Sequence, residues 1–246
     1  MKRELAMGVN AVDGLLDHAP ERIVRVWIKR SGARLETLAA RLKQHGVAIE
    51  IADDRALERL ADGVRHQGVI AEFKARDPID ENQLFDLVEK ADAPLLLVLD
   101  GVQDPHNLGA CLRSAAAAGA LAVVIPKDRA VGLTPAARRA AAGAAELMPV
   151  AMVTNLARTL SKLADLGVWR VGLDGEAGQS LFDVDLAGPL ALVMGSEEKG
   201  LRRLTGENCD VLAHIPMPGP IESLNVSVAA GVSLFEAVRA RATRKK

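Results

Sequence analysis

The sequence predicts an α/β protein of two domains, a small N-terminal α/β domain and a larger C-terminal domain built on a mostly parallel sheet. Short apolar runs alternate with segments of helical periodicity along most of the 246 residues. Hydrophobic residues make up 49% of the chain, which is enough for a sizeable core. Segment 77–92 contains six acidic residues and one lysine, hence a net charge of −5, and Pro78 and Pro94 border it. We interpret this segment as a solvated acidic linker with a short helix, between domains at 1–76 and 93–246.

The composition excludes several classes of protein. No apolar run approaches the roughly 20 residues that a membrane span needs, and the first residues lack the apolar stretch of a signal peptide. Cys111 and Cys209 offer neither a disulfide framework nor a metal-ligand spacing, and the five histidines are scattered. We therefore expect a cytoplasmic protein without a metal. Because the net charge is −1, nucleic-acid binding would depend on local patches.

The N-terminal domain switches repeatedly between the two hydrophobic periods. Helices are expected at 9–16, 35–42 and 55–60, and strands at 23–28, 47–51 and 68–73. Polar residues gather at its edges: Arg25, Lys29, Arg30, Arg34, Arg65, His66 and Gln67. They form either a solvated surface or a patch that contacts phosphate, and the net charge of +3 over 1–76 only slightly favours the patch.

The C-terminal domain alternates strands and helices throughout, which predicts a mostly parallel sheet covered on both faces. Strands are expected at 95–99, 121–125, 147–153, 168–173, 190–194 and 211–216, and helices at 107–118, 134–142 and 156–166, with a last helix after 224. The first strand is not followed by G-x-G-x-x-G, and no Walker-type phosphate loop occurs. The sequence therefore lacks the usual dinucleotide and nucleotide fingerprints.

Polar residues concentrate in three loops that follow strands, at 100–115, 194–201 and 215–227. Ligands of open α/β sheets gather at the carboxyl ends of strands, so these loops are the candidate site. Each residue also has a plainer interpretation. Asn107 could be a helix N-cap, Arg113 an exposed basic residue, and Glu197 part of an exposed first helical turn.

The three loops together resemble the three motifs of the SpoU-type (TrmH-like) RNA ribose 2′-O-methyltransferases. The first, at 100–115, reads D-x-x-x-D-P-x-N-x-G-x-x-x-R-S-A; the second, from Met194, reads M-G-S-E-x-x-G; the third, from Ile215, reads I-P-M-x-G-x-x-x-S-L-N-V-S. Three motifs in this order are far more specific than one short motif, and the resemblance covers about 93–242. The N-terminal domain is similar to the substrate-binding module of this family through Gly-Val-Asn-Ala-Val at 8–12 and His-Gln-Gly at 66–68.

The resemblance implies a SPOUT-type parallel sheet with a deep trefoil knot, beside a small N-terminal α/β RNA-binding domain, and it implies a homodimer. It also implies S-adenosylmethionine as the cofactor, bound by Gly195, Ile215, Met217 and Leu224. A loop stiffened by three prolines between 216 and 220 suits this task, because it preorganises the binding groups.

The family's catalysis depends on the arginine that corresponds to Arg113. A guanidinium keeps its proton at neutral pH, so we expect Arg113 to hold the target phosphate and to lower the pKa of the ribose hydroxyl, with phosphate or water accepting the proton. The resemblance makes four further residues part of the catalytic site, where they position Arg113, the ribose and the loops: Asn107, Glu197, Ser223 and Asn225.

The resemblance implies a guanosine in the peptidyl-transferase region of large-subunit (23S) rRNA as the substrate, because the chain has a dedicated N-terminal domain. A tRNA ribose 2′-O-methyltransferase is an open alternative. So is an RNA-binding protein without catalysis, although the intact Asn107, Arg113, Glu197 and Asn225 count against it. The missing phosphate loop disfavours a third alternative, an α/β enzyme for a small nucleotide.

Overall fold

The computed structural model describes residues 3–30, 32–197 and 199–244. The chain divides into two compact units: the first runs up to Asp77 and includes Ala142–Leu147, and the second holds Pro78–Ala141 and the chain from Met148 on. Helix α4 (Glu81–Glu89) buries Leu84 and Val88 in the core of the second unit. The acidic segment is therefore not the solvated linker that its charge predicts, because these two apolar residues, four apart, give α4 a face that packs.

The first unit has a mixed four-stranded sheet in the order β1-β4-β2-β3. Strand β4 (Val69–Lys74) pairs antiparallel with both β1 (Arg3–Met7) and β2 (Ile23–Ile28), and β2 pairs parallel with β3 (Ile49–Ile51). The sequence pattern did not predict β1, because this edge strand buries none of its residues fully and has too few apolar positions to show a period.

Helices cover both faces of this sheet unequally. On one face, α1 (Val9–His18) and α2 (Ala33–Gln44) share a core with the inward side chains of β2 and β4. On the other, α3 (Asp54–Ala61) covers a smaller cluster around Ile70. Two short elements complete the unit: the 3₁₀ helix η1 (Pro20–Arg22) and α7 (Ala144–Leu147).

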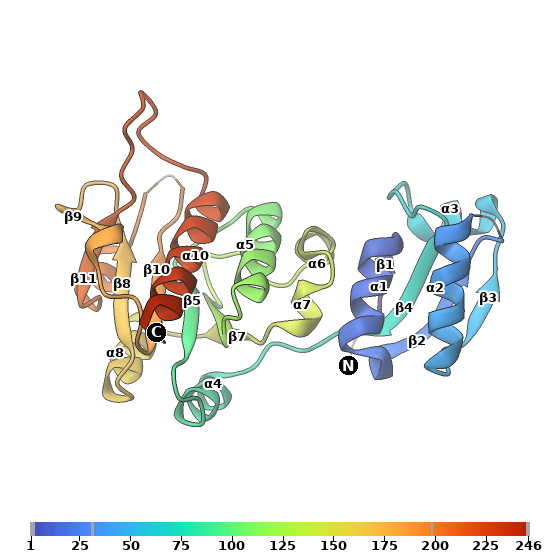
Figure 1. Cartoon of the computed structure of the whole chain (residues 1–246), viewed down its shortest axis with the longest axis horizontal. Coiled ribbons are helices and arrows are strands. Elements are labelled where there is room, and N and C mark those ends of the chain that lie inside the picture. Colours follow the sequence, from blue (N-terminus) through green and yellow to red (C-terminus); the bar gives the residue numbers. More distant parts are fainter. Residues whose placement is uncertain (1–2, 31, 198, 245–246) are drawn as a thin grey trace. The chain divides into compact units, whose positions relative to one another are not determined.

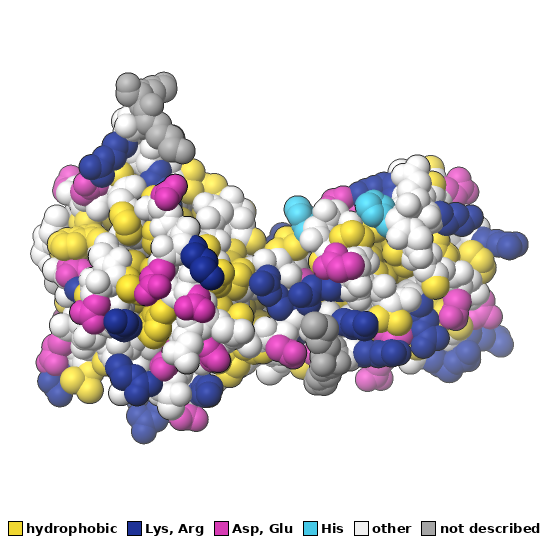
Figure 2. Space-filling model, turned by 90° about the horizontal axis from the view of Figure 1, so that it is seen from below, with side chains coloured by type: hydrophobic (Ala, Val, Ile, Leu, Met, Phe, Trp, Pro, Cys, Tyr) yellow, Lys and Arg dark blue, Asp and Glu magenta, His cyan; other side chains and the backbone are white. Residues whose placement is uncertain are grey.

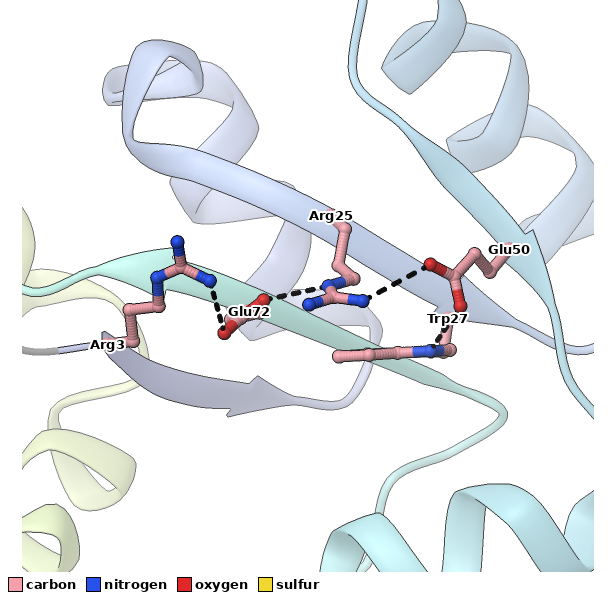
Figure 3. A network of polar contacts seen from close by, with 5 residues as sticks. All are labelled: Arg3, Arg25, Trp27, Glu50 and Glu72. Carbon is pink, nitrogen blue, oxygen red and sulfur yellow. Dashed lines mark hydrogen bonds and ion pairs between the residues drawn. The ribbon is translucent and has the colours of Figure 1, made fainter.

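Polar side chains form a network across the sheet of the first unit (Figure 3). Arg25 Nε donates to Glu72 at 2.8 Å, and its guanidinium lies 5.1 Å from the centre of the Trp27 ring. Trp27 Nε1 donates to Glu50 at 2.8 Å, and Arg3 donates to the second oxygen of Glu72 at 3.3 Å. The hydrogen bond from Arg25 holds the pKa of Glu72 below its usual range, although burial opposes this shift.

The second unit contains a seven-stranded sheet in the order β7-β6-β5-β10-β8-β11-β9, and its neighbouring strands pair parallel. The strands are β5 (Leu95–Leu99), β6 (Ala122–Pro126), β7 (Val150–Val153), β8 (Trp169–Leu173), β9 (Gln179–Ser180), β10 (Leu190–Met194) and β11 (Val211–His214). Every residue of β5 and β10 is buried, as expected for strands covered on both faces.

Helices lie on both faces of this sheet (Figure 1). On one face, α4 and α8 (Leu156–Asp165) share a core with alternate residues of the central strands. On the other, α5 (Pro105–Ala117) packs between α6 (Pro135–Ala141) and α10 (Val226–Arg244). Gly109 lets α5 approach α6, because a Cβ atom there would lie 2.7 Å from the backbone N of Ala141. No helix in the described part of the chain is long and apolar enough to cross a membrane.

Several predicted elements differ from the structure at their ends. The strand expected at 147–153 begins only at Val150, because the residues before it form α7. The strand expected at 211–216 ends at His214, two residues before the backbone N–H groups are interrupted by Pro216. Besides β1, five short elements in the described part of the chain were not predicted: η1, α7, β9, η2 (Leu181–Asp183) and α9 (Arg203–Glu207).

Candidate active site

A cavity of about 370 Å³ opens at the carboxyl ends of β8, β10 and β11. Its size falls in the range of sites for small organic ligands. It is lined by seven of the residues that the motifs predicted: Gly195, Glu197, Ile215, Met217, Ser223, Leu224 and Asn225. The second and third loops therefore meet at one place, as the strand-end argument requires. A cavity of about 390 Å³ at the amino ends of the same strands contains none of the predicted residues.

Asn107 joins the three loops through its side chain. It lies in the first turn of α5, its Nδ2 donates to Glu197, and its Oδ1 accepts from Asn225 Nδ2 at 3.0 Å. Asn107 is not the N-cap of α5, because Asp104 caps that helix by accepting from the backbone N–H of His106 at 2.9 Å. The plainer interpretation of Asn107 is therefore wrong, and its amide is free to connect the first loop to the other two.

Asn225 stands at the start of α10. Its Oδ1 accepts from the backbone N–H of Ser227 at 2.9 Å and from the Ser227 hydroxyl at 2.6 Å. Because Oδ1 is engaged in this way, Nδ2 is directed to Asn107. Asn225 thus caps the start of α10 and also lines the cavity.

Glu197 lies in a tight loop and not in a helical turn. Ser196 and Gly200 exchange two backbone hydrogen bonds, at 3.0 and 2.9 Å, and close the loop. A Cβ atom on Gly195 would lie 2.1 Å from the carbonyl carbon of Gly200, so only glycine allows this closure. The loop therefore presents the Glu197 carboxylate to Asn107 at the cavity.

Arg113 does not line the cavity. It is exposed on α5, and it forms no hydrogen bond or ion pair with any residue that the structure describes. Ser223 lines the cavity and is also exposed, in the segment between β11 and α10. The structure thus brings Asn107, Glu197 and Asn225 together and leaves the Arg113 guanidinium open to a partner from outside.

The cysteines are not nucleophiles in this site. Burial, with a smaller effect of the Glu197 carboxylate, raises the pKa of Cys111 to about 12. Burial likewise raises the pKa of Cys209 to about 12. Within residues 3–30, 32–197 and 199–244, no group of His, Cys, Asp and Glu side chains could hold a metal ion.

Several polar or flexible residues that line the cavity were not singled out from sequence, among them Asp174, Gly175, His214 and Glu222. Asp174 and Gly175 follow β8 directly, so the rule that ligands bind at the carboxyl ends of strands could have identified them. His214 ends β11, and Glu222 stands beside the predicted Ser223.

Comparison with known proteins identifies the class to which this fold and site belong. The model of the SpoU rRNA Methylase family matches residues 94–235, and the model of RNA 2′-O ribose methyltransferase substrate binding matches residues 5–79. The chain belongs to the SpoU rRNA Methylase family.

Among its relatives are two proteins named 23S rRNA (guanosine-2′-O-)-methyltransferase RlmB. The protein from Pseudomonas putida is 52% identical over 245 residues, which cover 98% of each chain. The protein from Escherichia coli K12 is 51% identical over 240 residues, which cover 97% of this chain and 99% of the relative.

A solved structure supports the fold. The SpoU methyltransferase AviRb from Streptomyces viridochromogenes, in complex with the cofactor AdoMet, has a TM-score of 0.78 at 24% identity and covers 98% of this chain and 91% of its own. The predicted SPOUT-type sheet is confirmed. The trefoil knot stays a prediction.

Proposed function

We propose that this chain transfers a methyl group from S-adenosylmethionine to the ribose 2′-hydroxyl of a guanosine in 23S rRNA, in the cytoplasm. The observation that carries this proposal is the hydrogen-bonded chain from Asn225 through Asn107 to Glu197, which joins all three motif loops beside the cavity. The RlmB relatives, 52% and 51% identical over nearly their whole length, support the guanosine and the 23S rRNA. The same names favour large-subunit rRNA over a tRNA as the substrate, and the family resemblance of the motifs supports a guanosine in the peptidyl-transferase region.

The residues around the cavity fit S-adenosylmethionine. Met194, Ile215 and Leu224 offer apolar surface, and Asp174 and Glu222 offer carboxylates suited to a cationic ligand with polar ends. Gly195, Ile215, Met217 and Leu224 would hold the cofactor, which supplies an electrophilic methyl group when bound. Pro216, Pro218 and Pro220 keep this wall of the cavity stiff.

The polar residues of the site would orient the acceptor ribose. Asn107 holds Glu197 at the cavity, and Asn225 holds Asn107, so the three side chains act as one unit that is set before the substrate binds. Such preorganisation lowers the entropy lost in reaching a reactive geometry. Ser223 adds a hydroxyl to the same wall.

Arg113 would act as a clamp on the RNA phosphate. Its exposed guanidinium has no acidic partner among the described residues, and a planar guanidinium binds phosphate through two parallel hydrogen bonds. A positive charge beside the target nucleotide lowers the pKa of the 2′-hydroxyl, and the phosphate or water takes the proton.

The N-terminal unit would bind the RNA at one edge of its sheet. β1 and β2 end there and β4 begins there, and α1 and α2 begin there. The first N–H of α1 donates to Gln67 Oε1 at 3.2 Å, whereas the N-cap of α2 is Gly32, which provides no side-chain cap. Helix N-termini without such a cap favour phosphate. Three arginines near this edge are exposed: Arg30, Arg34 and Arg65. Lys and Arg side chains are also prominent on the face of this unit that Figure 2 draws.

A second copy of the chain would cover α10 in a homodimer. Val228 and Phe235 on this helix are 51% and 50% exposed, and Leu224 just before it is 37% exposed. These residues recur at intervals of four and seven, so they form one apolar stripe beside the cavity. An apolar stripe of this kind on a solvent-exposed helix face marks a protein interface, and the commonest arrangement of identical chains is a two-fold symmetric dimer.

The proposal is tested by assaying transfer of a radiolabelled methyl group to 23S rRNA isolated from a strain that lacks this protein. We expect labelling at one guanosine of that RNA and none of wild-type RNA, in which the site is already methylated. Labelling of tRNA in place of 23S rRNA would overturn the choice of substrate. A failure to bind S-adenosylmethionine would overturn the enzyme itself.

A further inference from the structure

A buried carboxylate of the second unit lies outside the network described above. Asp100 follows β5 directly, and its side chain is 0% exposed. A buried charge is unfavourable unless it is paired and hydrogen-bonded. Oδ2 accepts from the backbone N–H of Arg202 at 3.0 Å, whereas Oδ1 makes no hydrogen bond and lies 3.4 Å from NH1 of the same arginine.

Asp100 holds both ends of the loop that carries Glu197. Its backbone N–H donates to the carbonyl of Met194 at 2.7 Å, directly before the loop, and its carboxylate binds Arg202 directly after it. Asp100 therefore hydrogen-bonds to the residues on both sides of the loop. Within the loop, the two backbone hydrogen bonds between Ser196 and Gly200 hold its two halves together.

The Arg202 side chain also contacts two further segments of the chain. Its NH2 group donates to the carbonyl of Arg129 at 3.4 Å, in the loop after β6. A Cβ atom on Gly101, which has a φ of +92°, would lie 3.2 Å from that NH2 group. The guanidinium thus lies directly against the backbone that leads to Asn107, and it is 41% exposed on its outer side.

We propose that Asp100 and Arg202 are positioning residues, whose ion pair holds loop 195–201 where Glu197 can accept a hydrogen bond from Asn107. Neither residue lines the cavity, so both act through the loop and do not touch the ligand. The inference rests on the proposed function for the identity of the ligand, S-adenosylmethionine. The closed loop itself is a property of the free chain.

A second ion pair of this unit provides a matched control. Asp210 accepts from both the backbone N–H and the Nε of Arg170, at 2.8 and 2.9 Å, in the same arrangement of one aspartate around one arginine. Both side chains of this pair are also largely buried: Arg170 is 13% exposed and Asp210 is 21% exposed. This pair joins β8 to the start of β11 and does not line the cavity.

The test compares hydrogen–deuterium exchange of the loop amides in the full chain and in the variants Asp100→Asn, Arg202→Met and Asp210→Asn. We expect the Ser196 and Gly200 amides to exchange at least about tenfold faster in the first two variants, since their local opening becomes easier. Asp210→Asn should leave these amides unchanged even if it lowers the melting temperature. Arg202→Lys should restore part of the protection, because it keeps the charge without the planar fork.

Calorimetry with S-adenosylmethionine is the second measurement. Binding should weaken by about tenfold in Asp100→Asn and Arg202→Met and stay within about twofold in Asp210→Asn, as expected when a preorganised loop must be reordered. If Asp100→Asn does not fold, Arg202→Met decides, because it keeps the backbone N–H bond to Asp100. Equal exchange of the loop amides in all three variants overturns the inference. If the wild-type chain binds no S-adenosylmethionine, the proposed function fails, and the exchange data still decide the role of the pair.

Discussion

Replacing Gly195 by alanine should damage the cofactor site in a way that the structure quantifies. The added Cβ would lie 2.1 Å from the carbonyl carbon of Gly200, 2.3 Å from the N atom of Leu201 and 2.4 Å from the oxygen of Gly200. These are backbone atoms that cannot rotate away, so the loop must move by roughly 1.5 Å to reach an ordinary van der Waals contact of about 3.5–4 Å. Gly195 is thus required by its own loop, and not only by the space that a cofactor would fill.

The movement breaks the two hydrogen bonds between Ser196 and Gly200. Each hydrogen bond contributes about 1 kcal/mol, so reforming the loop when the cofactor binds costs about 2 kcal/mol of binding free energy. The Kd for the cofactor should therefore rise about thirtyfold. A loss of this size lowers the melting temperature by about 4–8 °C for a unit of this length, so the variant stays folded at 25 °C.

Isothermal calorimetry with S-adenosylmethionine and a thermal melt check this prediction. Gly206→Ala is the matched control, because a Cβ atom there meets nothing within 4 Å in the helix α9. The control should keep its affinity and its melting temperature. Cofactor binding by folded Gly195→Ala within twofold of the wild-type affinity would refute the reasoning.

Four further outcomes are expected. Arg113→Ala should keep its cofactor affinity and lose at least about a hundredfold in single-turnover methyl transfer, with weak rescue by Arg113→Lys; near-normal rates for both would remove Arg113 from catalysis. Because the pKa of Glu72 is lowered in the folded chain, its stabilisation is present above the unfolded pKa of about 4.3 and is lost as the pH falls through the folded value. The difference in unfolding free energy between the wild type and Glu72→Gln, measured by urea melts, should therefore be largest at pH 6 and shrink as the pH is lowered below about 4.3. Phe235→Glu should convert the proposed dimer to a monomer in sedimentation velocity, and a wild-type chain that sediments as a monomer would contradict that dimer. Arg30→Glu and Arg65→Glu, each made singly, should weaken rRNA binding and reduce its salt dependence, whereas the same single change at Arg203, which is paired with Glu207 on α9, should leave both unchanged.

Much of the candidate site could be predicted because its residues stand next to elements with strong local signals. The run Leu95–Leu99 and the run Leu190–Met194 are apolar throughout, and the structure confirms both strands with these bounds. Polar residues that follow such strands must lie at the carboxyl edge of the sheet. This is why the loops at 194–201 and 215–227 could be located from sequence, whereas the choice of Gly195, Glu197 and Asn225 within them came from the resemblance of the motifs.

The sequence alone indicated most of the strands, the longer helices that cover them and the edge of the sheet at which the motif loops gather, because these depend on residues close together in the chain. It did not determine that Asn225 binds Asn107, 118 residues away, or that Arg202 pairs with Asp100, 102 residues away. Those contacts require β10 to lie between β5 and β8, an order that no local hydrophobic pattern encodes. The packing of α4 into the core was likewise decided by tertiary structure, since its acidic composition indicated solvent while two buried side chains, Leu84 and Val88, gained more from the core.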